Sequence, residues 1–252
     1  MLNRNQIYYN DCFEIFQEIE DHSIDLILID PPYQVTDHSW DQLLPFDKLW
    51  ENYKRILKKD SVVIIFGTEP FSSHCRLSNT NWYKFDFIWD KKIPSGMSYA
   101  KYQPMRQHEN IIVFCNGKLP YYPQMVKRDK PIKSGGQKSL NKGATQLDKY
   151  KVDNFSKTYD YKNPTSILSF MKIRKGSLHP TEKPVQLLEY LIKTFSKEGA
   201  LVLDNCCGSG STCLAAKNVN RNFIGIEKDE KYANIAKELL NNAVSISSNS
   251  DL

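Results

Sequence analysis

Short apolar runs alternate along this chain with segments of helical periodicity. Strands are expected over residues 24–29, 61–66, 85–89, 110–114, 200–203 and 222–226, and helices over 45–58, 184–195, 211–219 and 229–242. The first helix should bury one face, made of Phe46, Leu49, Trp50, Tyr53, Ile56 and Leu57. Strands and helices in alternation predict an α/β fold, with a doubly wound, mostly parallel sheet covered on both faces.

Residues 116–176 interrupt this alternation. They contain few apolar runs, the glycines 135, 136 and 143, and tyrosines interleaved with lysines. A long insertion of this kind in a compact domain is usually functional or disordered. We therefore divide the chain into residues 1–115, the insertion 116–176, a second half of the same domain at 177–242, and a tail at 243–252.

Charge is concentrated in the insertion. The chain carries a net charge of +5, whereas residues 116–176 hold 14 Lys or Arg and 4 Asp, which is +10, so the remainder is at −5. A basic segment on an acidic body indicates a polyanionic partner, and interleaved aromatic rings suit stacking on bases. The contacts to nucleic acid are expected from Lys127, Arg128, Lys133, Lys138 and Lys142.

Other classes of protein fit the sequence less well. The longest apolar runs fall short of the roughly 18–20 residues that span a bilayer, and the N-terminus lacks a secretory signal, so we expect a cytoplasmic protein without a membrane partner. The six cysteines form no CxxC pair, and no metal site is expected.

One candidate site directly follows the expected strand at 24–29. Asp30-Pro31-Pro32-Tyr33 places a carboxylate at the carboxyl edge of the sheet, where open α/β sheets bind ligands. The prolines remove backbone donors, which leaves a cluster of acceptors that suits an NH2 group. Tyr33 adds a flat face for a planar ring.

A second candidate site follows the strand at 200–203. Asp204 precedes a turn that contains Cys206, Gly208, Ser209, Gly210 and Thr212, and a helix begins there. Glycines in such a turn allow the backbone to approach a nucleotide-like ligand. Glu227 ends the next strand, at about the spacing from which an acid binds ribose hydroxyls. A dinucleotide oxidoreductase would share this feature but gives no account of residues 30–33.

Together these motifs resemble those of the amino-methylating DNA methyltransferases that use S-adenosylmethionine. Residues 30–33 resemble the catalytic DPPY, residues 204–212 resemble the cofactor loop DPFxGSGTT, residues 179–184 resemble HPTxKP, and residues 10–12 resemble a GDC-type motif. The catalytic motif precedes the insertion and the cofactor loop follows it, which is the permuted order of the β group. Asn205-Cys206 replaces the family's Pro-Phe, and Asn10 replaces its Gly.

The resemblance implies a Rossmann-like fold and a role for each motif. Asp30 and the Pro31 carbonyl would bind the amine of a flipped-out adenine, with Pro32 stiffening the turn and Tyr33 stacking on the base. S-adenosylmethionine would be held at its amino-acid end by Asp204, at its ribose by Glu227 and at its adenosine by Asp11 and Cys12. Thr181 and Lys183 would lie near its carboxylate, with His179 beside them.

The resemblance also implies double-stranded DNA as a partner, with a homodimer and a cognate restriction endonuclease as further expectations. Asp30 favours N6 of adenine, whereas N4-cytosine enzymes more often carry Ser at that position. RNA, a protein glutamine and an inactive nucleic-acid-binding subunit are alternatives that the sequence favours less. No Pro-Cys pair occurs, which argues against methylation at carbon 5 of cytosine.

Overall fold

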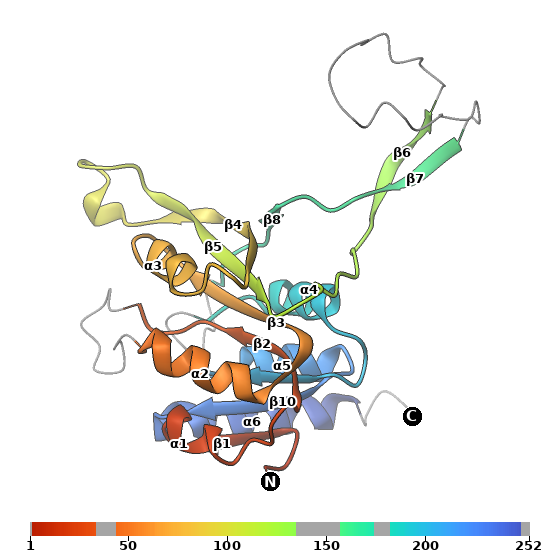
Figure 1. The fold of residues 1–252 in the computed structure, drawn as a ribbon. Coiled ribbons are helices and arrows are strands. Elements are labelled where there is room, and N and C mark those ends of the chain that lie inside the picture. Colours follow the sequence, from red (N-terminus) through yellow and green to blue (C-terminus); the bar gives the residue numbers. More distant parts are fainter. Residues whose placement is uncertain (1, 34–43, 135–156, 174–181, 248–252) are drawn as a thin grey trace. The chain divides into compact units, whose positions relative to one another are not determined.

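The computed structural model describes residues 2–33, 44–134, 157–173 and 182–247. The chain divides into two compact units (Figure 1). Met1–Tyr122 and Ser166–Leu252 form the first unit, and Pro123–Thr165 form the second. The second unit lies inside the basic segment 116–176.

The first unit is built on an eight-stranded sheet, in the order β1-β10-β9-β2-β3-β5-β4-β8. Neighbouring strands are parallel from β1 to β3 and between β4 and β8, whereas β5 is antiparallel to both β3 and β4. The fold is therefore α/β with a mostly parallel sheet, as the alternating pattern predicted. The strands are β1 (Gln6–Tyr9), β2 (Ile24–Ile29), β3 (Leu57–Gly67), β4 (Tyr83–Ser95), β5 (Arg106–Cys115), β8 (Ile167–Ser169), β9 (Leu201–Asp204) and β10 (Asn222–Glu227).

Helices cover both faces of this sheet (Figure 1). Side chains alternate along each strand, so Leu26 and Leu28 of β2 pack with one set of helices, and Ile27 and Ile29 pack with the other. The first set is α4 (Val185–Phe195), α5 (Ser211–Asn218) and α6 (Glu230–Ser247), and the second is α1 (Cys12–Phe16), α2 (Phe46–Ile56) and α3 (Phe71–Ser78). Two hydrophobic cores result, one on each face.

The central strands bring the two candidate sites together. β2 and β9 are parallel neighbours, with Leu26 opposite Val202 and Ile27 opposite Leu203. Asp30 follows β2 directly and Asp204 ends β9. Because parallel neighbours end at the same edge, the two carboxylates lie at one crevice.

Several elements differ from the sequence prediction. The helix expected over 45–58 ends at Ile56, and Leu57 already begins β3, where it is buried as the strand's first residue. The last helix continues past residue 242 to Ser247, within the segment expected as a tail. β1, α1, α3 and β8 were not predicted, and the antiparallel pairing of β4 with β5 was not foreseen.

The second unit is a two-stranded antiparallel ribbon of β6 (Val126–Ser134) and β7 (Lys157–Lys162). Its register is interrupted between Lys127 and Ile132. The large apolar side chains of the ribbon are 43–53% exposed: Val126, Ile132, Tyr159 and Tyr161. Lys127 and Lys133 are exposed as well, and the Arg128 guanidinium donates to the Tyr161 carbonyl at 3.2 Å. Lys138 and Lys142 lie outside the described residues.

No helix in the described parts of the chain has the length and apolar character that a membrane crossing requires.

Candidate active site

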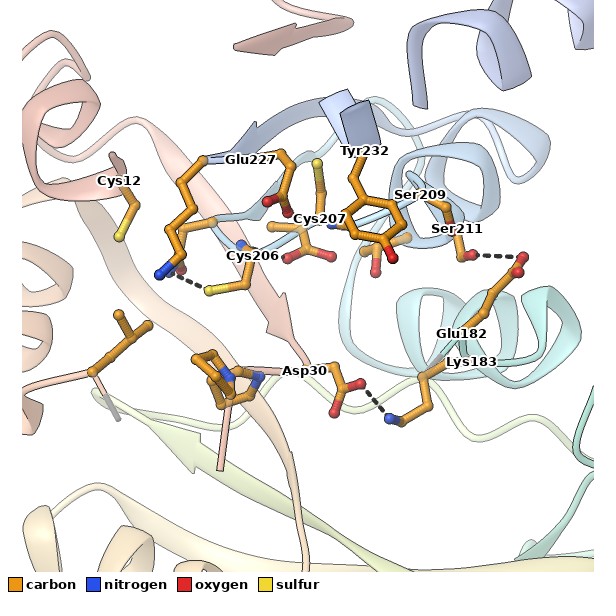
Figure 2. Close-up of a pocket in the computed structure, with 18 of the residues that line it drawn as sticks. Cys12, Asp30, Glu182, Lys183, Cys206, Cys207, Ser209, Ser211, Glu227 and Tyr232 are labelled. Atoms are coloured by element: carbon orange, nitrogen blue, oxygen red, sulfur yellow. Dashed lines mark hydrogen bonds and ion pairs between the residues drawn. The ribbon is translucent and has the colours of Figure 1, made fainter. Parts of the chain in front are cut away.

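A pocket opens at the carboxyl edge of β2, β9 and β10 (Figure 2). Both sequence-predicted motifs contribute to its wall, and so does the N-terminal motif. The expected site residues that line it are Asp11, Cys12, Asp30, Pro31, Pro32, Tyr33, Lys183, Asp204, Cys206, Gly208, Ser209, Thr212 and Glu227. His179 and Thr181 lie outside the described residues.

Asp30 is held at both carboxylate oxygens. The Tyr33 hydroxyl donates to Oδ1. The Lys183 ammonium donates to Oδ2 (Figure 2). Tyr33 packs its ring against Phe71 of α3, with the centroids 4.8 Å apart. Burial raises the pKa of Asp30, and the ammonium of Lys183 opposes that rise. Asp30 is thus a fixed, largely desolvated acceptor.

Lys183 connects Asp30 to a second pair of buried charges. Its ammonium lies 3.5 Å from Glu109 Oε2, and Glu109 Oε1 lies 3.1 Å from Lys91 Nζ. The side chains of Lys91 and Lys183 are only 3% and 8% exposed. Two cations and two anions therefore alternate from Lys91 and Glu109 to Lys183 and Asp30, and their formal charges cancel.

Breaking this row should destabilise the protein. Glu109→Gln removes one anion and leaves the buried ammonium of Lys91 without its counter-charge. We expect the free energy of unfolding to fall by about 3–5 kcal/mol, the usual cost of breaking a buried ion pair. Urea denaturation measures the loss, with Glu18→Gln on the surface as control. A loss equal to that of the control would show that the row contributes no stability.

Glu227 and Asp204 present carboxylates from the ends of two adjacent strands. Glu227 accepts from the backbone N–H of Gly208 at 2.8 Å and of Asp229 at 2.9 Å. Asp204 accepts from the Cys206 N–H at 3.0 Å, and burial raises the pKa of Asp204 to about 7. The backbone amides fix both carboxylates and leave lone pairs for a ligand.

Two glycines of this region are required by packing. Gly210 is the N-cap of α5 with φ of +88°, and a Cβ there would lie 2.9 Å from the Ala236 side chain of α6. A Cβ on Gly225 would lie 2.4 Å from Ile7. The sequence prediction placed Gly210 against the cofactor, but Gly210 is not among the residues that line the pocket.

The N-terminal motif, residues 10–12, contributes a helix cap and a buried thiol to the pocket wall. Asp11 caps α1, because its Oδ1 accepts from the Phe13 N–H at 2.8 Å. Burial raises the pKa of the Cys12 thiol to about 12, and burial also raises the pKa of Cys206 well above its ordinary value. These thiols are neutral at physiological pH, so they are poor nucleophiles.

Several lining residues were not expected. Tyr232 of α6 enters the pocket opposite Asp30, and Ser211 donates to Glu182 at 3.2 Å (Figure 2). The Tyr53 hydroxyl donates to Asn205 Oδ1 at 2.6 Å behind the loop. Helical periodicity predicts that Tyr232 lies on the inward face of its helix, but no local sequence feature predicts a contact with a ligand.

Most of the chain matches a known family. A family model described as DNA methylase, for N6 and N4 methyltransferases, matches residues 24–238. The chain belongs to this family of DNA methylases. A DNA methylase of this family takes its methyl group from S-adenosylmethionine, which is therefore the cofactor. The carboxyl groups of Asp204 and Glu227 in the pocket wall suit a ligand that donates hydrogen bonds from hydroxyl and ammonium groups, as this cofactor does.

Individual relatives cover nearly the whole chain. The Type II methyltransferase M1.MboII of Moraxella bovis is 30% identical over 96% of this chain and 98% of its own length. The Type II methyltransferase M.BglII of Bacillus subtilis is 28% identical over 94% of this chain and 69% of its own length.

Solved structures show the same fold. The M1.HpyAVI–SAM complex superposes with a TM-score of 0.63 at 24% identity, and covers 93% of this chain and 98% of its own. The cytosine-N4-specific PvuII DNA methyltransferase also gives 0.63, at 17% identity, over 92% of this chain and 84% of its own.

Proposed function

We propose that this DNA methylase transfers a methyl group to the exocyclic N6 amine of adenine in double-stranded DNA. The observation that carries the proposal is the position of Asp30, which follows β2 directly and faces the same pocket as the cofactor loop. Asp at this position, where N4-cytosine enzymes more often carry Ser, supports adenine as the base. N4 of cytosine is the alternative.

The adenine amine is a poor nucleophile because its lone pair is delocalised into the ring. Asp30 and the Pro31 carbonyl would accept its two hydrogens, which favours a tetrahedral nitrogen with a directed lone pair. Each carboxylate oxygen of Asp30 has a second lone pair, so it can accept from the amine while Tyr33 and Lys183 still donate. Fixed acceptors of this kind lower the barrier mainly by positioning.

The remaining lining residues would hold the cofactor. When bound, S-adenosylmethionine supplies an electrophilic methyl group on its sulfonium sulfur. We assign the ribose hydroxyls to Glu227 and the amino-acid end to Asp204, since both carboxylates are oriented by backbone amides. Asp11 and Cys12 would lie by the adenosine, and Lys183 would lie near the carboxylate.

DNA is the substrate of this proposal, and the basic residues of the second unit would contact it. The base is inaccessible inside a duplex, so it must be flipped out to reach Asp30. A homodimer and a cognate restriction endonuclease are further partners that rest on the family resemblance alone.

The direct test is to identify the product. The protein is incubated with labelled S-adenosylmethionine and unmethylated DNA, and the DNA is digested to nucleosides for mass spectrometry. We expect labelled N6-methyladenine. N4-methylcytosine would overturn the base assignment, and label in RNA or protein alone would overturn DNA as the substrate.

A further inference from the structure

The β4–β5 hairpin carries exposed side chains that the active site does not use. Residues 96–105 join the two strands and include a short helix, η1 (Met97–Tyr99). Met97 and Tyr102 are each 74% exposed, and Tyr99 is 62% exposed. Large apolar groups gathered on one exposed tip are unusual on a protein surface and indicate a binding site.

Backbone hydrogen bonds hold this tip in a defined shape. The N–H of Tyr99 donates to the Gly96 carbonyl at 3.0 Å, and the N–H of Tyr102 donates to the Tyr99 carbonyl at 2.9 Å. Gly96 has φ of +91°, which a residue with a side chain rarely adopts. The aromatic rings are thus displayed on an ordered turn.

The charge of the hairpin indicates which kind of partner it can bind. Residues 93–108 contain Lys101 and Arg106 and no Asp or Glu, whereas Lys92 is paired with Asp90 at 2.7 Å. The Lys101 ammonium lies 4.8 Å from the centroid of the Tyr102 ring, so a cation and an aromatic face are presented together. Cations beside exposed aromatic rings suit phosphates and bases at the same time.

The base of the hairpin reaches the catalytic charges. A second cavity is lined by Ser95 and Arg106 at the ends of β4 and β5, and also by Lys91, Glu109 and Lys183 of the charge row. Tyr33 lines this cavity as well as the cofactor pocket. Any duplex that delivers a base to Asp30 must therefore lie close to the hairpin.

We propose that the β4–β5 hairpin contacts duplex DNA beside the flipped base, with Lys101 and Arg106 on phosphates and Tyr99 and Tyr102 against neighbouring bases. This inference rests on the proposed function and adds a contact outside the basic insertion. A second copy of the chain is a poorer partner, because a symmetric contact would bring the same cations together.

The test uses the double substitution Tyr99→Ala and Tyr102→Ala in the full chain. Binding to a short labelled DNA duplex is followed by fluorescence anisotropy at several salt concentrations. We expect the dissociation constant to rise about tenfold, in line with the loss of stacking on one or two bases. Lys101→Ala should weaken binding and lower the salt slope by about one.

Leu77→Ala is the matched control, because Leu77 is 73% exposed on α3 and lies outside the tip residues 96–105. Binding of S-adenosylmethionine by calorimetry should be unchanged in every variant, which shows that the first unit is folded. Unchanged duplex affinity in the tyrosine variant would overturn the proposal.

Two further results distinguish failure of this inference from failure of the proposed function. A tyrosine variant that sediments as a smaller species without DNA, and binds duplex like the wild type, would make the hairpin an interface between copies and overturn the proposal. If the wild type binds duplex but forms no methylated nucleoside, the proposed function fails, while the comparison of variants still decides the hairpin's role.

Discussion

Replacing Asp30 by alanine should abolish methyl transfer and leave cofactor binding measurable. The substitution removes the acceptor for the amine, and loss of one such fixed electrostatic contact typically costs about 10²–10³-fold in rate. The carboxylates of Asp204 and Glu227 that are assigned to the cofactor stay in place. Transfer of labelled methyl to DNA gives the rate, and calorimetry gives the affinity for S-adenosylmethionine.

Asp25→Ala is a matched control for this variant. Asp25 lies on the same strand, β2, and also pairs with a lysine, with Lys58 Nζ 2.8 Å from its Oδ1. It sits at the opposite end of the strand from the pocket, so its loss should cost stability without abolishing transfer. Methyl transfer by Asp30→Ala at the rate of this control would contradict the role of Asp30.

Charge reversal in the basic segment should have the second large effect. Changing Lys133, Lys138 and Lys142 to Glu removes three candidate phosphate contacts and adds repulsion. Each lost contact lowers the slope of log affinity against log salt by about 0.9, so the slope should flatten by roughly three and affinity at low salt should fall by orders of magnitude. Anisotropy titrations across salt concentrations measure both quantities.

A control for net charge is available on the first unit. Lys48 and Lys54 of α2 and Lys237 of α6 are exposed, and reversing all three changes the total charge equally. If both triple variants flatten the salt slope to the same extent, the effect comes from overall charge, and the basic segment is not the DNA contact.

Periodicity predicted those elements that bury a continuous apolar stripe or run. α2 and α4 each bury a helical face, β2 is apolar except at Asp25, and β3 is apolar from Val62 to Phe66. β1 escaped prediction because it is an edge strand in which only Ile7 is buried. α1 escaped because five residues are too few to show a helical period.

The sequence predicted site residues only where they belong to a recognisable motif. Residues 30–33 and 204–212 stood out because strand ends, prolines and glycines have local meanings. The pairing of Lys183 with Asp30 spans 153 positions, so no local sequence pattern predicts it. Lys91 and Glu109 each lie two positions from an apolar run, where charged side chains are usually solvated. Their burial depends on the long-range pairing of β4 with β5.

The position of β10 in the sheet determines when the pocket can form during synthesis. β1 and α1 are synthesised before β9 and β10, yet β10 and β9 lie between β1 and β2 in the sheet. Within the described residues, β1 pairs with β10 alone, so it has no neighbouring strand until β10 has been made. A nascent chain can assemble β2 and β3 early, but the walls around Asp11 and Glu227 close only when β10 inserts. A complete pocket therefore requires β10, and fragments that end before β10 would carry Asp30 without the wall that Glu227 provides.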